Sequence, residues 1–183
     1  GEQKESIFAV TIPERPGSFQ EFCHLIGNRG ITEFNYRYAD ASDAHVFAGI
    51  QLKDGEKEKQ AVLEKLREKQ FPVVDLSNDE MAKQHIRYMV GGRSPNLGNE
   101  RLYRFEFPER PGALVRFLTH LKGQWNISLF HYRNHGSDYG RVLAGFQVPD
   151  EEMNEFRTFL DCLGYTYGDE TDNPAYKLFL AST

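Results

Sequence analysis

One pentapeptide, Pro-Glu-Arg-Pro-Gly, occurs twice in this chain and carries its clearest chemical potential. It stands at residues 13–17 and again at residues 108–112, each time between a strand-like apolar run and a helix-like one. Unpaired N–H groups and the dipole at a helix start favour an anion, and glycine lets a ligand approach the backbone closely. We therefore predict an anion site at each turn, suited to the α-carboxylate of a free amino acid.

A purely structural interpretation of the turn is also open. Proline fixes φ and glycine permits a tight connection from strand to helix, whatever the turn binds. This interpretation explains one copy well, but it explains poorly why glutamate and arginine return in both copies. The carboxylates of Glu14 and Glu109 occupy equal positions in the repeat, which fits symmetry better than unlike acid and base roles.

A second pair of motifs lies on the strand expected after each helix, Asn35-Tyr36-Arg37 and His131-Tyr132-Arg133. Alternate residues of a strand share a face, so Asn35 lies with Arg37 and Tyr36 points to the opposite face. Two interpretations are equally open. In one the tyrosines pack across strands and the arginine is at the surface; in the other the tyrosines close an effector pocket with an apolar wall and a hydroxyl.

The remaining polar residues do not predict catalysis or metal binding. His131 and His135 are four residues apart, but on a strand they would be separated by roughly 13 Å, too far for one zinc ion. The sequence also lacks Gly-x-Ser-x-Gly, a Walker loop, GxGxxG and Cys-x-x-Cys. We expect neither catalytic residues nor metal ligands in this chain.

The repetition extends far beyond the pentapeptide, and each copy is predicted to run strand, helix, strand, strand, helix, strand. A last short strand is expected in each copy, at residues 86–90 and 176–180. This order predicts an α+β two-layer sandwich with an antiparallel sheet and the helices on one face. Residues 1–91 form the first unit, residues 92–99 the linker and residues 100–183 the second unit. Because units of this size are small, we expect them to pack side by side around one continuous core.

Bulk properties exclude several classes of function. The formal net charge of −5 and the pI near 5.7 argue against a nucleic-acid partner, which requires a basic face. No apolar run approaches the ~20 residues that would span a membrane, and no signal peptide is visible. Cys23 and Cys162 are expected to be buried free thiols in a reducing compartment, which favours a cytoplasmic protein.

Longer segments carry a resemblance to a known family. The chain resembles, over essentially all of its 183 residues, the C-terminal regulatory region of biosynthetic threonine deaminase, also called threonine ammonia-lyase. The segments that carry the resemblance are Val-Thr-Ile-Pro-Glu-Arg-Pro-Gly-Ser-Phe (10–19), Thr-Glu-Phe-Asn-Tyr-Arg (32–37), Arg-Tyr-Met-Val-Gly-Gly (87–92), Asn-Ile-Ser-Leu-Phe-His-Tyr-Arg (126–133), Asp-Tyr-Gly-Arg-Val-Leu (138–143) and Asp-Glu-Thr-Asp-Asn-Pro-Ala (169–175).

The resemblance implies two ferredoxin-like, ACT-type subdomains that sense isoleucine as feedback inhibitor and valine as antagonist. It further implies a tetrameric parent enzyme that uses pyridoxal phosphate to convert threonine to 2-oxobutanoate and ammonia. This chain has no Ser-Gly-Gly-Gly-type phosphate loop and no lysine in a recognisable Schiff-base context. We therefore expect it to hold no cofactor and to be inert, as an excised regulatory domain or a stand-alone relative whose partner is the catalytic domain.

The predicted effector site combines the two turns with the strand motifs. The ligand carboxylate is expected at N–H groups of residues 15–18 or 110–113, and its ammonium at a glutamate, at Asn35 or at backbone carbonyls. The number of sites, one or two per chain, is left open. The predicted effector-binding residues are Glu14, Arg15, Pro16, Gly17, Ser18, Phe19, Asn35, Tyr36, Glu109, Arg110, Pro111, Gly112, Ala113, Leu114, Leu118, His131 and Tyr132.

Two rival functions remain. The strand–helix order also fits an RNA-recognition module, but residues 45–50 and 141–146 lack its Lys/Arg-Gly-Phe start and the chain is acidic. A small metabolic enzyme is disfavoured because no catalytic constellation is present.

Overall fold

The computed structural model of the chain describes residues 4–121, 123–134, 136 and 138–182. Both copies of the repeat have the predicted order of strands and helices. The first contains β1 (Lys4–Pro13), α1 (Ser18–Ile26), β2 (Ile31–Arg37), β3 (Asp43–Leu52), α2 (Gly55–Glu68) and β4 (Val73–Asp75). The second contains β5 (Glu100–Pro108), α4 (Ala113–His120), β6 (Ile127–Arg133), β7 (Tyr139–Gln147), the 3₁₀ turn η2 (Asp150–Glu152), α5 (Met153–Leu163) and β8 (Thr166–Asp169).

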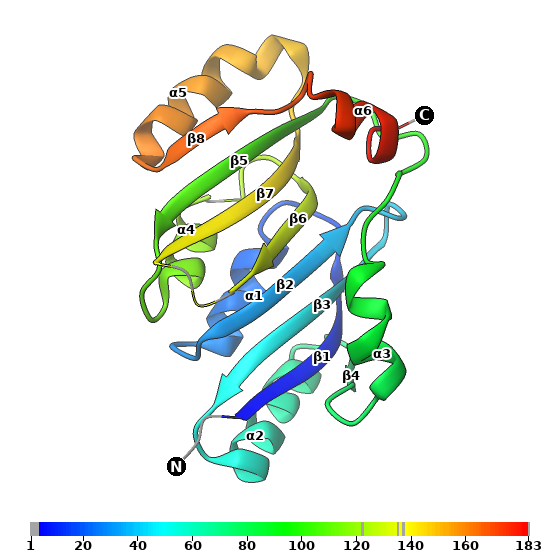
Figure 1. Cartoon of the computed structure of the whole chain (residues 1–183), viewed down its shortest axis with the longest axis vertical. Coiled ribbons are helices and arrows are strands. Elements are labelled where there is room, and N and C mark those ends of the chain that lie inside the picture. The colour runs from blue at the N-terminus through cyan, green and yellow to red at the C-terminus, as the bar shows by residue number, and fades with distance from the viewer. Residues whose placement is uncertain (1–3, 122, 135, 137, 183) are drawn as a thin grey trace.

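The strands form one sheet of eight, in the order β4-β1-β3-β2-β6-β7-β5-β8 (Figure 1). Neighbouring strands are antiparallel throughout. The two copies join where β2 pairs with β6, with Glu33 opposite Arg133 and Arg37 opposite Leu129. The predicted side-by-side packing is therefore confirmed, and the sheet continues without a break from one ACT-like subdomain to the other.

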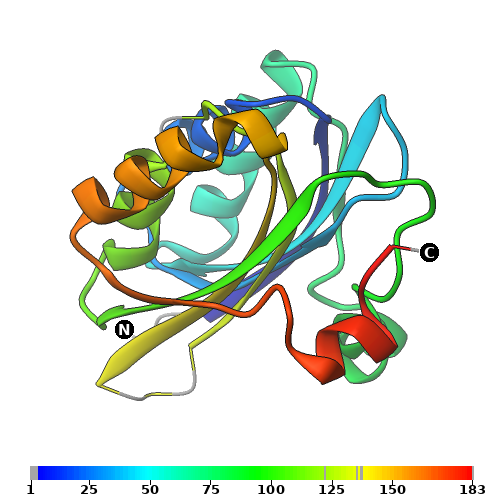
Figure 2. The ribbon, with the colours of Figure 1, turned by 90° about the horizontal axis from the view of Figure 1, so that it is seen from above.

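Helices α1, α2, α4 and α5 cover one face of this sheet (Figure 2). A single core of buried residues beneath them draws on both subdomains. At the junction the rings of Phe34 and Phe130 meet edge to face with their centroids 5.3 Å apart. Phe117 of α4 lies on Phe130, and Phe19 of α1 contacts both junction rings. The predicted continuous core is thus confirmed, and at the junction it is built from aromatic side chains, which bury a large area each.

The two predicted terminal strands are wrong. Residues 86–88 form a 3₁₀ turn, η1 (Ile86–Tyr88), after a short helix α3 (Glu80–Gln84), and residues 174–179 form a helix, α6 (Pro174–Phe179). Local capping explains both helices. The Asp79 carboxylate accepts a hydrogen bond from the Ala82 N–H, and the Asn173 side chain does the same for Ala175, with proline at the first helical position.

These two extra segments lie on the second face of the sheet, so the expectation that helices occupy only one face is also wrong (Figure 2). Ala82 of α3 packs against Ile7 and Phe47. Tyr176 of α6 packs against Leu102 and Leu129.

One of the two cysteine expectations is wrong as well, because Cys23 is buried while Cys162 is exposed. Cys162 lies on the outer side of the amphipathic helix α5.

One interpretation of the sequence places Arg37 at the surface, but this residue is buried, with only 7 % of its area exposed. Its guanidinium forms a salt bridge with Glu100 of β5 and donates to the carbonyl oxygens of Gly92 and Leu180. Glu100 in turn accepts hydrogen bonds from Ser128 and Tyr176. This cluster ties the first subdomain to the segment between the subdomains and to the end of α6.

We predict that Arg37→Ala lowers the free energy of unfolding by about 3–5 kcal/mol, because it leaves the Glu100 carboxylate buried without its cation. Denaturant unfolding measures this loss. The matched control is Arg133→Ala, at the corresponding position of the second copy, where the guanidinium only contacts Tyr88. The control should cost less than about 1 kcal/mol. Equal losses in the two variants would contradict the role of the cluster.

Candidate functional site

Each pentapeptide ends on a glycine in the left-handed conformation, which allows the chain to turn directly from strand into helix. Gly17 has φ 92° and Gly112 has φ 79°, and neither helix start is capped by a side chain. A residue with a Cβ would be strained at these angles. The N–H groups at both helix starts therefore remain available to a ligand rather than to a capping side chain.

The backbone N–H groups that remain available to a ligand at the two turns are partly different from the predicted ones. Within residues 15–18 only the Gly17 N–H is free, because Arg15 and Ser18 donate to carbonyls of the turn itself and Pro16 has none. The corresponding Ala113 N–H is likewise used, by the Arg110 carbonyl. Among the described residues, the N–H groups without a hydrogen-bond partner at the helix starts are those of Gly17, Phe19 and Gln20 in the first copy and of Gly112, Leu114 and Val115 in the second.

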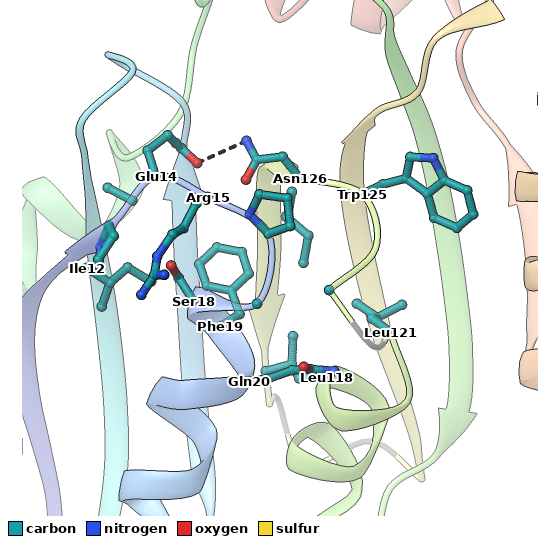
Figure 3. A pocket seen from close by; sticks show the side chains of 16 residues that line it. Ile12, Glu14, Arg15, Ser18, Phe19, Gln20, Leu118, Leu121, Trp125 and Asn126 are labelled. Atoms are coloured by element: carbon teal, nitrogen blue, oxygen red, sulfur yellow. Dashed lines mark hydrogen bonds between the residues drawn. The ribbon is translucent and has the colours of Figure 1, made fainter. Parts of the chain in front are cut away.

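Each turn faces the other subdomain across a cleft. The first cleft lies between the turn at residues 12–20 and the loop that follows α4 (Figure 3). From the second subdomain it is lined by Leu118, Leu121, Gly123, Trp125, Asn126 and Ile127. The second cleft lies between residues 109–115, with Tyr132, and the loop that follows α1, with Gly30, Ile31 and Thr32. The pseudo-two-fold packing thus creates two related clefts, and each one is made by both subdomains.

A partly buried carboxylate lies in the first cleft. Oε2 of Glu14 accepts a hydrogen bond from Nδ2 of Asn126 at 3.0 Å, across the subdomain boundary (Figure 3). Oε1 of Glu14 is buried and has no hydrogen-bond partner among the described residues, and neither has the hydroxyl of Ser18. Burial raises the pKa of Glu14 to about 7, although the Asn126 hydrogen bond acts against this shift. A ligand that brings a donor or a positive charge to Oε1 would satisfy this carboxylate.

The loop after α4 closes tightly on the first turn. Gly123 has φ 64°, and a Cβ at this position would lie 2.7 Å from both Cα and N of Gly17. At Gly112, by contrast, a Cβ would meet nothing within 4 Å. The cavity volume open to a water-sized sphere is about 20 Å³ in the first cleft and about 340 Å³ in the second. The first cleft is therefore the narrower of the two.

The second cleft holds its glutamate differently. The Tyr132 hydroxyl donates to the carboxylate of Glu109, with both oxygens at 3.0 Å, and the Tyr132 ring stacks on Phe107. Burial raises the pKa of Glu109, while the Tyr132 hydrogen bond lowers it. In the first copy, Tyr36 instead packs on Phe19 and its buried hydroxyl has no partner. The two glutamates, equal in the sequence repeat, thus have unlike surroundings.

The structure brings together most of the predicted residues, in two groups. Glu14 to Phe19 meet Leu118 in the first cleft, and Glu109 to Leu114 meet Tyr132 in the second. Tyr36 lies in the core behind Phe19. Asn35 and His131 face one another across the β2–β6 junction on the opposite face of the sheet, where Asn35 donates to Glu33. These two residues are therefore not part of either cleft.

Apart from Leu118, sequence reasoning missed the residues that each cleft receives from the other subdomain, above all Gly123 and Asn126. The available signal was the repeat itself, because side-by-side copies with a two-fold relation place the loop after one helix against the turn of the other copy. Asn126 corresponds to Gly30 in the repeat, so only the first cleft has an amide to hold its glutamate.

A sequence model of the family described as "C-terminal regulatory domain of Threonine dehydratase" matches residues 1–86 and 91–180 of the chain. The chain belongs to this family. Each matched block contains one pentapeptide and therefore one of the two turns that open on a cleft. The resemblance noted from the sequence segments is thus confirmed, and the ACT-like fold of both repeats agrees with it.

Curated relatives carry the same family name. The chain is 59 % identical over 181 residues to the biosynthetic L-threonine dehydratase IlvA of Escherichia coli strain K12, covering 99 % of this chain and 35 % of that protein. It is 55 % identical to IlvA of Burkholderia multivorans, over 99 % of this chain and 36 % of that protein, and 48 % identical to the mitochondrial threonine dehydratase of Saccharomyces cerevisiae, over 98 % and 32 %. The chain spans about a third of the length of these relatives.

The described residues contain no group of three or more His, Cys, Asp and Glu side chains that could hold a metal ion. His135, considered with His131 as a possible ligand, lies outside the described residues. No helix in the described ranges is long and apolar enough to cross a bilayer.

We predict that Glu14 makes the protein less stable as the pH rises. Its pKa is raised in the folded state, so the folded protein holds the proton more tightly and stability is lost between about pH 4.5 and about pH 7. Glu14→Gln should reduce this loss by roughly 1–2 kcal/mol. Denaturant unfolding of both proteins at acidic and slightly alkaline pH measures it. The control, Glu64→Gln on the exposed side of α2, should leave the pH dependence unchanged.

We also predict that Gly123→Ala destabilises the protein by about 2–4 kcal/mol, because the methyl group would collide with the backbone of Gly17. Gly164→Ala is the matched control. Gly164 has a left-handed backbone with φ 77° at the end of α5, but its Cβ would meet nothing within 4 Å. The control should lose only about 1 kcal/mol for the left-handed backbone. Thermal or denaturant unfolding that gave the same loss for both would refute the close approach.

Proposed function

We propose that this chain is an allosteric regulatory domain that binds isoleucine as an inhibitor and valine as an antagonist. Through these ligands it controls a threonine ammonia-lyase that depends on pyridoxal phosphate. One observation carries the proposal: each cleft combines free N–H groups of a helix start, a partly buried glutamate and an apolar wall. These three features match the carboxylate, the ammonium and the side chain of a free aliphatic amino acid. Membership of a regulatory-domain family supports the same conclusion.

The loop at Gly123 must move away from Gly17 to admit a ligand to the first cleft. The ligand carboxylate then accepts hydrogen bonds from the N–H groups of Gly17, Phe19 and Gln20. The ammonium meets the unpartnered Oε1 of Glu14, and the side chain lies against Leu118 and Leu121 of the other subdomain. An ammonium beside Glu14 stabilises the ionised carboxylate, so binding is coupled to proton release from this group. In the second cleft the corresponding groups are the helix start at Gly112, the carboxylate of Glu109 and the side chain of Ile31.

Opposite effects of isoleucine and valine require more than a difference in affinity. Isoleucine exceeds valine by one methylene, which is worth about 0.8 kcal/mol when buried. Two ligands act in opposite directions only if they favour different arrangements of the protein. Because each cleft is lined by both subdomains, a longer side chain changes how closely they approach. We propose that this distance, rather than affinity, separates inhibitor from antagonist.

The catalytic partner, its tetrameric assembly and its cofactor belong to the part of the relatives that this chain does not span. The residues of this chain do not fit pyridoxal phosphate, which forms a Schiff base with a lysine in enzymes of this kind. Within the described ranges the buried lysine is Lys59, and its ammonium is paired with Glu56 and Asp75 on the sheet side of α2. No step of the proposed regulation passes through the cofactor.

The alternative of an RNA-recognition module has little support in the packing. Such modules stack bases on aromatic side chains of the sheet face that carries no helices. In this chain Phe47 of β3, on that face, is only 3 % exposed because α3 packs on it. Arg37 and Glu100 form a buried ion pair on the same face. The covered Phe47 ring and the buried ion pair leave no open aromatic surface at these positions for bases to stack on.

We predict that replacing a turn glycine, by Gly17→Val or Gly112→Val, strongly weakens the binding of isoleucine at the affected cleft. Gly17→Val and Gly112→Val block the approach of the carboxylate and strain the left-handed turn, and Phe19→Ala and Leu114→Ala test the neighbouring wall. Isothermal titration calorimetry with isoleucine should show at least a tenfold loss of affinity, about 1.4 kcal/mol, for the cleft that binds. Circular dichroism identifies variants that fail to fold.

Gly98→Ala serves as the control for these titrations, because its Cβ would meet nothing within 4 Å and its backbone is not left-handed. It should bind isoleucine like the unchanged protein. Unchanged affinity in folded variants of both clefts would remove the turns from the effector site and refute the proposal.

A further inference from the structure

Each pentapeptide also borders a second depression, which is lined by residues of its own subdomain alone. We call these depressions the outer hollows. The outer hollow of the second subdomain is lined by Phe107, Pro108, Arg110, Ala113, Arg116 and Tyr165. That of the first is lined by Pro13, Arg15, Glu21, His24, Leu25, Lys69, Gln70 and Phe71. The two hollows occupy equivalent places in the repeat, so a comparison between them shows which features are peculiar to each.

The outer hollow of the second subdomain combines two cations with an apolar wall. Arg110 and Arg116 are exposed, and neither guanidinium has an ion pair or hydrogen bond with any described residue. Burial raises the pKa of Tyr165, and the charge of Arg116 is close enough to act against this shift. The Tyr165 ring stands edge-on to Phe107 at 6.0 Å, and its hydroxyl is held by His120. Among the described residues, no acidic side chain lines this hollow.

The outer hollow of the first subdomain carries its own anion. Arg15 corresponds to Arg110 in the repeat, but Glu21 stands where the second copy has Arg116. The guanidinium of Arg15 pairs with the carboxylate of Glu21 at 3.4 Å. A difference at one position, Glu21 in the first copy and Arg116 in the second, therefore decides whether the hollow holds an ion pair or two unpaired guanidinium groups.

We propose that the outer hollow of the second subdomain binds a small aliphatic carboxylate that lacks an ammonium group. Guanidinium groups hold carboxylates through paired hydrogen bonds in the plane of both groups. A short carbon chain lies against Phe107 and Tyr165. An amino acid is disfavoured because two arginines repel its ammonium and the hollow offers no carboxylate to receive it. The two clefts contain Glu14 and Glu109 for that purpose, so the clefts and the hollow select different classes of ligand.

The test is an NMR titration of the ¹⁵N-labelled chain with butanoate, 2-aminobutanoate and inorganic phosphate as separate probes. Butanoate should shift the Nε–Hε signals of Arg110 and Arg116 saturably, with a dissociation constant on the order of 1 mM. 2-Aminobutanoate, which has the same carbon skeleton with an added ammonium, should bind there at least tenfold more weakly. Added salt should weaken butanoate binding, because the site is exposed and charged.

Reciprocal variants use the two copies as controls for each other. Arg116→Glu gives the second hollow the ion pair of the first and should weaken butanoate binding at least tenfold. Glu21→Arg removes the ion pair of the first hollow and should create saturable butanoate shifts at Arg15. Arg141→Ala, an exposed arginine of β7 outside both hollows, should bind like the unchanged protein. All three changes are at exposed side chains, and an amide spectrum verifies folding in each case.

Three results would overturn the proposal: equal binding of butanoate and 2-aminobutanoate at the arginines, undiminished binding in folded Arg116→Glu, or binding of phosphate without binding of butanoate. The same spectra separate this proposal from the effector function. Isoleucine at the clefts is detected at the amides of Gly17 and Gly112, which do not line the outer hollow. Arg110 lines both the second cleft and the hollow, so the signal that reports the hollow alone is Nε–Hε of Arg116, which lines neither cleft. Failure at one of these signals therefore leaves the other to be judged independently.

Discussion

The antiparallel pairing of β2 with β6 is the constraint on which the rest of the structure depends. It joins two four-stranded units into one sheet and brings Phe34 and Phe130 together in a shared core. It also fixes the pseudo-two-fold relation that sets each pentapeptide turn against the loop of the other subdomain. Neither cleft would exist in one copy alone, because six lining residues of each come from across this junction. A ligand in a cleft consequently contacts both subdomains, which are joined by this strand pair and by the shared core.

Equal sequence positions do not produce equal sites in this protein. Asn126 holds Glu14 in the first cleft, while Gly30 stands at its place in the second and Tyr132 holds Glu109 instead. The first cleft is also narrowed by Gly123 against Gly17. The duplicated turns supply the same backbone donors, but the width of each cleft and the hydrogen-bond partner of its glutamate differ between the two copies. The duplication thus provides two versions of one arrangement rather than two copies.

Much of the fold was predictable because it follows local periodicity. The alternation of apolar residues gave each strand and helix of both repeats, and the length of the units favoured a shared core. Periodicity failed at residues 86–88, which form a 3₁₀ turn directly after the helix that Asp79 begins, and at residues 174–179, where Asn173 begins a helix. It also failed for Arg37, since its partners Glu100 and Leu180 lie 63 and 143 residues away in the sequence. The turns were found because they repeat; Gly123 and Asn126 were not, because contacts between copies leave no local pattern.

The outermost strands are the shortest in the sheet, β4 with three residues and β8 with four. After each of these strands the chain continues along the edge of the next strand without regular pairing. Leu76 and Ser77 form hydrogen bonds with Ile7 of β1, and Glu170 and Thr171 form hydrogen bonds with Leu102 of β5. Long, bare margins of a flat sheet recruit further strands and lead to fibrous aggregation. Joining two units through β2 and β6 doubles the width of the sheet but leaves only two edges, as in a single unit. Because both edges end in short strands, they offer few unpaired backbone groups to which another chain could add.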